Sequence, residues 1–223
     1  MLSPAMPNHI DRVLGALGQV NSKHVCEIGC GQGALTYELA KKGARISASD
    51  ISAEAVKETR DRNREFIPRQ VDIQQMNACN LLYADESFDF VVGMAILHHV
   101  DLAKVAKEVS RVLKPNGKAV FVEPLSYNPL SNLWRGLSPS IRVPYEHPLL
   151  YSDISEMGKQ FRSTVYSEYA LLTLLSSFVY LITCSHTAKK KAADFLERLE
   201  PKVLKVCKPL RKYSGAILIE FAK

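Results

Sequence analysis

A glycine-rich loop between a short apolar run and a helical pattern is the feature that most constrains this 223-residue sequence. The apolar run ends at Ile28, glycines follow at Gly29, Gly31 and Gly33, and a helical pattern begins at Ala34. Glycine is needed where the backbone takes a positive φ or where a ligand comes close to it. The helix that follows presents unpaired N–H groups at its N-terminus. The stretch therefore predicts a strand, a ligand-binding loop and a helix.

The loop by itself fits two kinds of nucleotide cofactor. Gly29, Gly31 and Gly33 form G-x-G-x-G, whereas Gly29, Gly31 and Ala34 form the G-x-G-x-x-G/A pattern of dinucleotide sites. Asp50 ends a second alternating run, about 20 residues further on, where a ribose-binding carboxylate is expected. A nicotinamide cofactor and S-adenosylmethionine would both place a ribose there, so the pattern leaves both open.

Length and composition favour a single α/β domain in a reducing compartment. The chain is 47% hydrophobic and long enough for a full core. Its five cysteines are odd in number and include no C-x-x-C pair, so neither a disulfide framework nor a metal site is expected. We see no signal-peptide pattern and no apolar run of membrane-spanning length. These observations predict a cytoplasmic protein.

The positive charge is concentrated near the C-terminus. Residues 186–223 carry 10 Lys or Arg against 4 Asp or Glu, which accounts for the whole net charge of +6. Such a segment can contact nucleic acid, an anionic membrane surface or a phosphorylated ligand, or it can form a solvated helix face. We expect no nucleic-acid partner. Peripheral contact of this basic segment with an anionic membrane and a plain solvated face both stay open.

Strand-like and helix-like segments alternate along the chain. Strands are expected over residues 23–28, 44–49, 71–76, 88–94, 118–122, 161–169 and 215–221. Helices are expected over residues 8–20, 34–42, 102–113 and 188–206 and after Ser52, the one at 188–206 with an apolar face of Ala192, Phe195, Leu196, Leu199, Val203 and Val206. The breaker sequence 114–117 should separate a helix from the fifth strand. This alternation predicts parallel pairing and a doubly wound sheet.

The most apolar segment, residues 170–182, is too short to span a bilayer. We expect it to form a helix buried in a cap, with a lipid-contacting helix as the alternative.

Several motifs follow one another in order between residues 23 and 124. They are the loop at 26–33, Asp50, and the segments 87–92, 95–100 and 108–118. Together they resemble the class I S-adenosylmethionine-dependent methyltransferases, in particular their small-molecule, type-11-like branch. The resemblance implies a Rossmann-like, doubly wound, seven-stranded sheet with its last strand antiparallel. It also resolves the choice at the glycine loop in favour of S-adenosylmethionine, with S-adenosylhomocysteine as product.

The resemblance divides a single domain into three parts. Residues 1–124 would form the Rossmann-like core that binds S-adenosylmethionine. Residues 125–160, which contain several prolines, would form an irregular substrate lid at the carboxyl edge of the sheet. Residues 161–223 would complete the sheet and carry a helical cap insertion.

The resemblance also implies cofactor-binding roles for individual residues. The methionine half of the cofactor would be lined by Glu27 and by the loop backbone at Gly29, Cys30, Gly31 and Gly33. Asp50 would bind both ribose hydroxyls, and Ile51 would pack against the adenine. Asn77 and Ala78 occupy the place of the family's usual Asp-Ala pair, whose acid reaches the adenine amine; the Asn77 carbonyl can accept the same bond. Ala95, after the fourth strand, completes this set.

Candidate catalytic residues follow the fourth and fifth strands. Methyl transfer is an in-line displacement, so the protein mainly aligns the nucleophile and excludes water. His98 and His99 are the best-placed candidates for a general base, with Glu123 and Tyr127 as further candidates. Neighbouring side chains point in different directions, so at most one histidine should face the acceptor. A packing or backbone-bonding role for both histidines is the alternative.

A buried carboxylate without a partner is costly, so Glu123 should either pair with a cation such as Arg135 or Arg142 or have a functional role. Within the lid, further candidates are Trp134, Tyr145, Glu146 and His147.

The sequence therefore predicts an enzyme that methylates a small, apolar or amphiphilic acceptor such as a quinone, an isoprenoid or a lipid precursor. The apolar segment and the basic tail suggest this acceptor class. A nicotinamide-dependent oxidoreductase is disfavoured because no Tyr-x-x-x-Lys constellation follows the fourth strand. A non-catalytic cofactor-binding module is disfavoured by the intact loop and Asp50.

Overall fold

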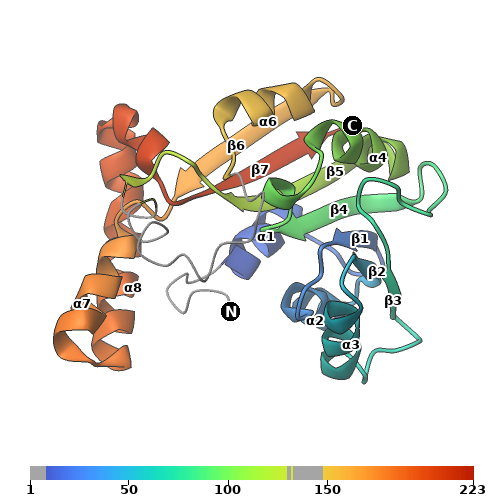
Figure 1. The fold of residues 1–223 in the computed structure, drawn as a ribbon, viewed down its shortest axis with the longest axis horizontal. Coiled ribbons are helices and arrows are strands. Elements are labelled where there is room, and N and C mark those ends of the chain that lie inside the picture. Colours follow the sequence, from blue (N-terminus) through green and yellow to red (C-terminus); the bar gives the residue numbers. More distant parts are fainter. Residues whose placement is uncertain (1–8, 130–131, 133–147) are drawn as a thin grey trace.

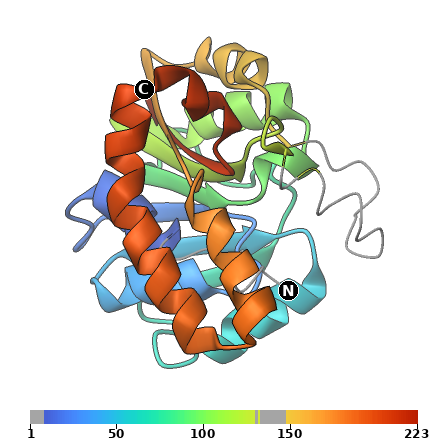
Figure 2. The ribbon, with the colours of Figure 1, turned by 90° about the vertical axis from the view of Figure 1, so that its left-hand side faces the viewer.

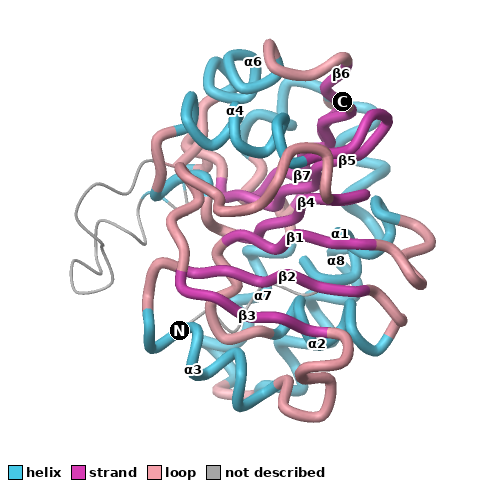
Figure 3. The backbone as a smooth tube through the Cα atoms, turned by 90° about the vertical axis from the view of Figure 1, so that its right-hand side faces the viewer, coloured by secondary structure: helices cyan, strands magenta, loops and turns pink. Residues whose placement is uncertain are grey.

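A seven-stranded sheet in the order β3-β2-β1-β4-β5-β7-β6 forms the centre of the computed structural model, which describes residues 9–129, 132 and 148–223 (Figures 1 and 3). The strands are β1 His24–Ile28, β2 Arg45–Asp50, β3 Val71–Gln75, β4 Phe88–Met94, β5 Leu113–Pro124, β6 Ser163–Tyr169 and β7 Ala216–Ala222. Strands β1 to β5 pair in parallel, and β7 runs antiparallel to both of its neighbours. The Rossmann-like sheet with an antiparallel last strand is thereby confirmed.

Helices connect the strands in the order that the sequence predicts. They are α1 His9–Leu17, α2 Ala34–Lys41, α3 Ala53–Arg62, α4 Leu102–Val112, α6 Tyr151–Gly158, α7 Ser176–Thr183 and α8 His186–Val206, with short 3-10 turns η1 Leu97–His99, η3 Thr173–Leu175 and η4 Lys208–Tyr213. Helix α3 begins at the expected cap, because the Ser52 hydroxyl accepts a bond from the Ala55 amide. Asp101 caps α4 in the same way.

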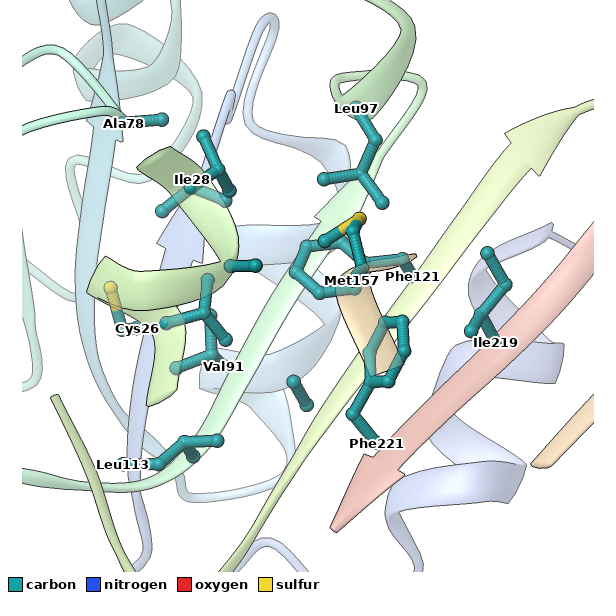
Figure 4. Close-up of a cluster of buried hydrophobic side chains, with 14 of the residues drawn as sticks. Cys26, Ile28, Ala78, Val91, Leu97, Leu113, Phe121, Met157, Ile219 and Phe221 are labelled. Carbon is teal, nitrogen blue, oxygen red and sulfur yellow. The ribbon is translucent and has the colours of Figure 1, made fainter. Parts of the chain in front are cut away.

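The two faces of the sheet carry separate hydrophobic clusters. Successive strand residues point to opposite faces, so Cys26 and Ile28 belong to one cluster and Val25 to the other. The first cluster packs under α4 through residues such as Val109 and under α6 through Met157. Figure 4 labels Met157 among the buried side chains of this cluster. The second packs under α1 and α2. Both faces of the sheet are therefore covered, as a doubly wound fold requires.

The carboxyl ends of β1 to β5 meet at one edge of the sheet because these strands are parallel. The last residue of β6, Tyr169, pairs with the first residue of β7, Ala216, and Pro124 at the end of β5 pairs with Ala216 from the other side. The connection 170–215 therefore leaves and rejoins the sheet at this same edge. It carries α7 and α8, which lie side by side there (Figures 1 and 2).

Strand β5 is longer than predicted. The breaker sequence does end α4, but residues 113–117 continue directly into the strand instead of forming a separate turn. The register against β4 shifts between Phe88 and Phe90, and Asn116 has a φ of +63°. The residues that stop the helix are therefore absorbed into an irregularity of the sheet.

The C-terminal helices differ from the sequence-based expectation in their burial. Residues 170–182 do not form one buried helix, since they divide into η3 and α7, and Ile182 is 83% exposed. Helix α8 exists as predicted, but its expected apolar face is not the one that packs inward: Phe195 is 62% and Val206 87% exposed. The buried positions are Ala193, Glu200 and Leu204.

Polar contacts explain how α8 is turned. The buried carboxylate of Glu200 accepts bonds from the Ala170 and Leu172 amides, at 2.7 and 2.8 Å. Three residues earlier on the same side, Glu197 pairs with Arg12 of α1 at 3.3 Å. These two contacts turn the side of α8 that carries Glu197 and Glu200 toward the rest of the protein. The apolar side chains of Phe195 and Val206 therefore face outward.

The region expected to be an irregular lid contains the helix α6 among its described residues. Helix α6 lies within residues 125–160, and its Ile154 and Met157 are buried in the core cluster over α4. Residues 130–131 and 133–147 lie outside the described part of the chain.

Candidate functional site

The glycine loop leaves β1 through three positive φ angles, +67° at Gly29, +52° at Gly31 and +72° at Gly33. A Cβ on Gly29 would lie 2.8 Å from the Ile96 side chain, and a Cβ on Gly33 would lie 2.7 Å from the Asn63 amide. A Cβ on Gly31 would meet nothing within 4 Å. Close packing therefore requires glycine at Gly29 and Gly33, whereas Gly31 borders open space.

Two polar residues, Thr59 of α3 and Asn63 at the C-terminal cap of this helix, support the loop through hydrogen bonds. The Thr59 hydroxyl donates to the Gly31 carbonyl at 2.7 Å, and the Asn63 amide donates to the Gly33 carbonyl at 3.2 Å. Both side chains are fully buried. Sequence reasoning missed them, although two short polar residues four positions apart on one face of a charged helix are a usable signal.

Cys30 contributes to the loop through its backbone. Its amide donates to the Ser49 carbonyl at 3.0 Å, while its side chain is buried in the cluster under α2. Burial raises the pKa of the Cys30 thiol to about 12. This cysteine is therefore an unreactive packing residue at physiological pH.

Asp50 joins the loop to the start of α3. Its Oδ2 accepts a bond from the Gly31 amide at 2.9 Å, and its Oδ1 accepts one from the Ser52 amide at 3.0 Å. The neighbouring Ile51 is 68% exposed. A half-buried carboxylate is thus held beside the open side of the loop, next to an exposed apolar side chain. This arrangement suits a sugar hydroxyl pair and a flat apolar ring.

Glu27 is a buried carboxyl at the end of β1. It is 3% exposed, and the Thr36 hydroxyl of α2 donates to its Oε2 at 2.5 Å. Burial raises the pKa of Glu27 to about 8; the nearby Asp50 charge raises it further, and the Thr36 bond opposes both effects. Glu27 is therefore protonated at neutral pH. A cation bound beside it would favour the ionised form.

The other predicted cofactor residues also lie at the carboxyl ends of strands. Asn77, after β3, is exposed, and its Oδ1 accepts a bond from the Cys79 amide at 2.9 Å, while Ala78 is buried. Ala95, after β4, has a φ of +53° and donates its amide to the Val122 carbonyl. A non-glycine residue in this conformation is uncommon and is found preferentially at functional sites.

Glu123, near the end of β5, holds the turn that follows β4 through hydrogen bonds. Its Oε1 accepts bonds from the Ile96 and Leu97 amides, both at 2.8 Å, and its Oε2 lies 2.7 Å from His98 Nδ1. Both side chains are buried. Glu123 accepts the two amides through Oε1, and in the contact with Oε2 the Nδ1 atom of His98 is the donor. Glu123 therefore fixes both the η1 turn and the tautomer of His98.

The remaining catalytic candidates are placed differently. His99 is exposed, and its ring centroid lies 3.9 Å from that of His98. Tyr127 stacks on Tyr151 of α6, with ring centroids 5.6 Å apart, and Tyr151 in turn contacts Tyr166 of β6. The structure thus joins His98 to Glu123 and places Tyr127 in an aromatic cluster. The lid candidates Trp134, Tyr145, Glu146 and His147 and the proposed partners Arg135 and Arg142 lie outside the described residues.

Comparison with known proteins shows what this chain is similar to. Residues 26–121 match the family model of the methyltransferase domain. The matched segment is less than half of the chain, and it is similar to the methyltransferase domain, as the sequence motifs indicated. The matched residues contain the glycine loop, Asp50, the histidine pair and most of β5.

One relative with a similar sequence is the ubiquinone biosynthesis O-methyltransferase of Alkalilimnicola ehrlichii, which is 32% identical over 130 residues, covering 57% of this chain and 52% of that protein. The chain thus spans about half the length of the curated relatives it matches.

Two solved structures show the same fold. The geranyl diphosphate C-methyltransferase of Streptomyces coelicolor A3(2), solved with Mg²⁺, geranyl diphosphate and S-adenosylhomocysteine, aligns with a TM-score of 0.67 at 16% identity, over 96% of this chain and 77% of that one. The phosphoethanolamine N-methyltransferase 2 of Haemonchus contortus, solved with S-adenosylmethionine, aligns with a TM-score of 0.69 at 18% identity, over 100% of this chain and 54% of that one.

Proposed function

We propose that this protein transfers the methyl group of S-adenosylmethionine to a small apolar or amphiphilic acceptor. The observation that carries the proposal is the Asp50 carboxylate, held by the Gly31 and Ser52 amides beside an unfilled loop within the segment that is similar to the methyltransferase domain. A ribose needs such a fixed acceptor. The space beside Gly31 and the exposed Ile51 side chain fit the rest of an adenosyl group.

The residues present fit this cofactor by their chemistry. Asp50 would hold the ribose, Ile51 would contact the adenine, and Glu27 with the loop backbone would face the cationic amino-acid end. S-adenosylmethionine supplies a methyl group on a positively charged sulfur. What remains for this chain is to hold the acceptor in line, exclude water and, for an acidic hydroxyl or amine, take up a proton.

His98 is the residue that we assign to the proton, and Glu123 is the residue that positions it. The assignment is supported by the short contact of Nδ1 with Glu123, which orients the ring and makes Nε2 the nitrogen that would take up the proton. Exposed His99 adjoins this pair and would be dispensable. Tyr127 would contribute to the wall of the acceptor space through its stack on Tyr151.

The acceptor class is supported by two different observations. The similar protein of Alkalilimnicola ehrlichii carries the name of a ubiquinone biosynthesis O-methyltransferase, which associates that relative with O-methylation in quinone biosynthesis. In this chain, exposed apolar side chains such as Leu175 and Ile182 lie on the connection at the carboxyl edge of the sheet. An apolar acceptor would be compatible with such surroundings.

Calorimetry with S-adenosylhomocysteine and with NAD tests the proposal directly. We expect binding of the thioether and none of the dinucleotide. Binding of NAD alone would support an oxidoreductase instead. Binding of neither ligand would contradict both cofactor assignments.

We expect alanine at Gly29 and at Gly31 to act on different properties. G29A should lower the free energy of unfolding by about 3 kcal/mol, because the new Cβ combines positive φ with overlap on Ile96. G31A meets open space, so the stability loss should be only about 1 kcal/mol, the cost of the backbone conformation. Its methyl group should nevertheless weaken binding of S-adenosylhomocysteine. Urea denaturation and calorimetry measure the two effects, and a G31A protein with wild-type affinity would contradict the placement of the ligand.

Binding should also be linked to ionisation of Glu27. In the free protein the pKa of Glu27 is raised to about 8 by burial, so the residue binds a proton at pH 7. A cationic ligand would lower that pKa, release the proton and make affinity rise with pH until about 8, above which it levels off. Titration of S-adenosylhomocysteine in buffers of different ionisation enthalpy measures the released proton.

Glu27→Gln should abolish this pH dependence because the amide does not titrate. Glu58→Gln, on the exposed side of α3, is the matched control and should keep it. Equal proton release by the wild type and Glu27→Gln would show that another group titrates.

A further inference from the structure

Helix α8 presents an outward face that mixes basic and large apolar side chains. The face consists of Lys191, Phe195, Arg198, Leu199, Lys202 and Val206, all exposed and spaced three or four residues apart. We call this set the α8 outer face. Of the three consecutive lysines at 189–191, only Lys191 belongs to it. Lys189 lies instead over the Tyr180 ring of α7, 5.6 Å from its centroid.

The acidic residues of α8 do not neutralise this face. Glu200 is buried and binds backbone amides, and Glu197 pairs with Arg12. Exposed Asp194 lies three residues after Lys191 and four residues before Arg198, so it borders the outer face on that side. The outer face therefore combines three basic side chains and exposed apolar area with this one carboxylate at its border.

We infer that the α8 outer face docks on an anionic lipid bilayer. Lysine and arginine would contact lipid phosphates while Phe195, Leu199 and Val206 enter the headgroup boundary, which is the composition of helices that lie in a membrane interface. Among the described residues, no helix is both long and apolar enough to span a membrane, so the contact would be peripheral.

Other occupants fit this face less well. A second copy of the chain related by a twofold axis would bring Lys191, Arg198 and Lys202 against the same charges on its partner. Nucleic acid would bind the cations but would leave Phe195 and Val206 without an apolar environment. An anionic bilayer satisfies both kinds of side chain at once.

The position of α8 gives such docking a use. The connection that carries α8 leaves and rejoins the sheet at Tyr169 and Ala216, beside the end of β5. This is the carboxyl edge, where β1 leads into the glycine loop and β2 ends at Asp50. Docking would bring that edge close to the lipid surface. Delivery of an amphiphilic acceptor from the bilayer is the part of this inference that rests on the proposed function, whereas docking itself does not.

Co-sedimentation with vesicles tests the inference. We expect the full chain to sediment with vesicles of phosphatidylcholine and phosphatidylglycerol mixed in about a 2:1 ratio and to stay in solution with phosphatidylcholine alone. The triple variant K191E/R198E/K202E should lower the partition coefficient about 100-fold, since each basic residue contributes measurably at an anionic surface. F195S/V206S should lower the partition coefficient about 10-fold. The single variant F195L, which keeps an apolar side chain at this position, should retain most of the binding.

The control is K57E/R69E/K107E, which makes the same change in net charge at exposed positions elsewhere. It should bind vesicles like the wild type. Failure of the wild type to sediment would overturn the inference, as would equal loss in the control, which would mean unspecific charge attraction. Unchanged binding of F195S/V206S would also overturn it, because no apolar group would then enter the lipid. Calorimetry with S-adenosylhomocysteine on the same variants keeps failure of the proposed function separate, since the outer face lies outside the cofactor site.

Discussion

Asp50→Ala should weaken binding of S-adenosylhomocysteine about 100- to 1000-fold, the cost of losing two charge-assisted hydrogen bonds to ribose hydroxyls. The carboxylate is more than an exposed loop-end group, because it also accepts the Gly31 and Ser52 amides. We therefore expect the same variant to lose about 2 kcal/mol of stability. Calorimetry and urea denaturation, done on the same preparation, separate the two losses.

Two further variants make this prediction specific. Asp50→Asn keeps one side-chain oxygen that accepts a bond from a backbone amide, so it should keep most of the stability. It cannot accept bonds from both ribose hydroxyls and should therefore still bind S-adenosylhomocysteine weakly. Asp72→Ala removes an exposed carboxylate from the neighbouring strand β3 and should leave affinity unchanged. Wild-type affinity in Asp50→Ala at full folding would rule out the ribose assignment.

Glu123→Gln should reduce methyl transfer about 100-fold or more while cofactor affinity stays near the wild-type value. The glutamine oxygen can still accept the Ile96 and Leu97 amides, but its NH₂ group would donate to His98 Nδ1. The His98 proton would move to Nε2, and the ring could no longer take up a proton there. Formation of S-adenosylhomocysteine with a hydroquinone as acceptor measures the rate, and nitrogen NMR of His98 reports the tautomer.

The controls distinguish positioning from simple loss of structure. Glu123→Ala would leave buried N–H groups without an acceptor, so its free energy of unfolding should be about 3 kcal/mol lower than that of the wild type. The glutamine variant should not show this loss. His99→Ala should keep most of the rate because that side chain is exposed. A Glu123→Gln protein with an unchanged rate and an altered His98 tautomer would remove the base from the proposal.

Sequence alone was sufficient for the sheet and the loop because their signals are local. Strand β4 is a buried apolar run, and its observed bounds, Phe88–Met94, are those predicted. The glycines and the Ser52 cap likewise depend on a few neighbouring residues. Asp50 could be placed at the loop because consecutive parallel strands end at one edge.

The contacts that organise the site could not be predicted in this way. Glu123 binds a turn 25 to 27 residues earlier in the chain, and nothing in the local pattern indicates that its carboxylate accepts bonds from backbone amides. The rotation of α8 is similar, since Glu200 and Glu197 decide it through partners 28 to 185 residues away. Periodicity identified the helix correctly and its inner face wrongly, because two buried polar anchors outweighed the apolar stripe.

The return of the chain to its starting point has an evolutionary consequence. Tyr169 and Ala216 are direct partners in the sheet, so the excursion between them begins and closes at a single pair of residues. Such an insertion can lengthen, shorten or be exchanged between homologues without altering any strand register. A different acceptor specificity or a different location in the cell can then arise by replacing this one insertion, while the nucleotide-binding half is inherited unchanged.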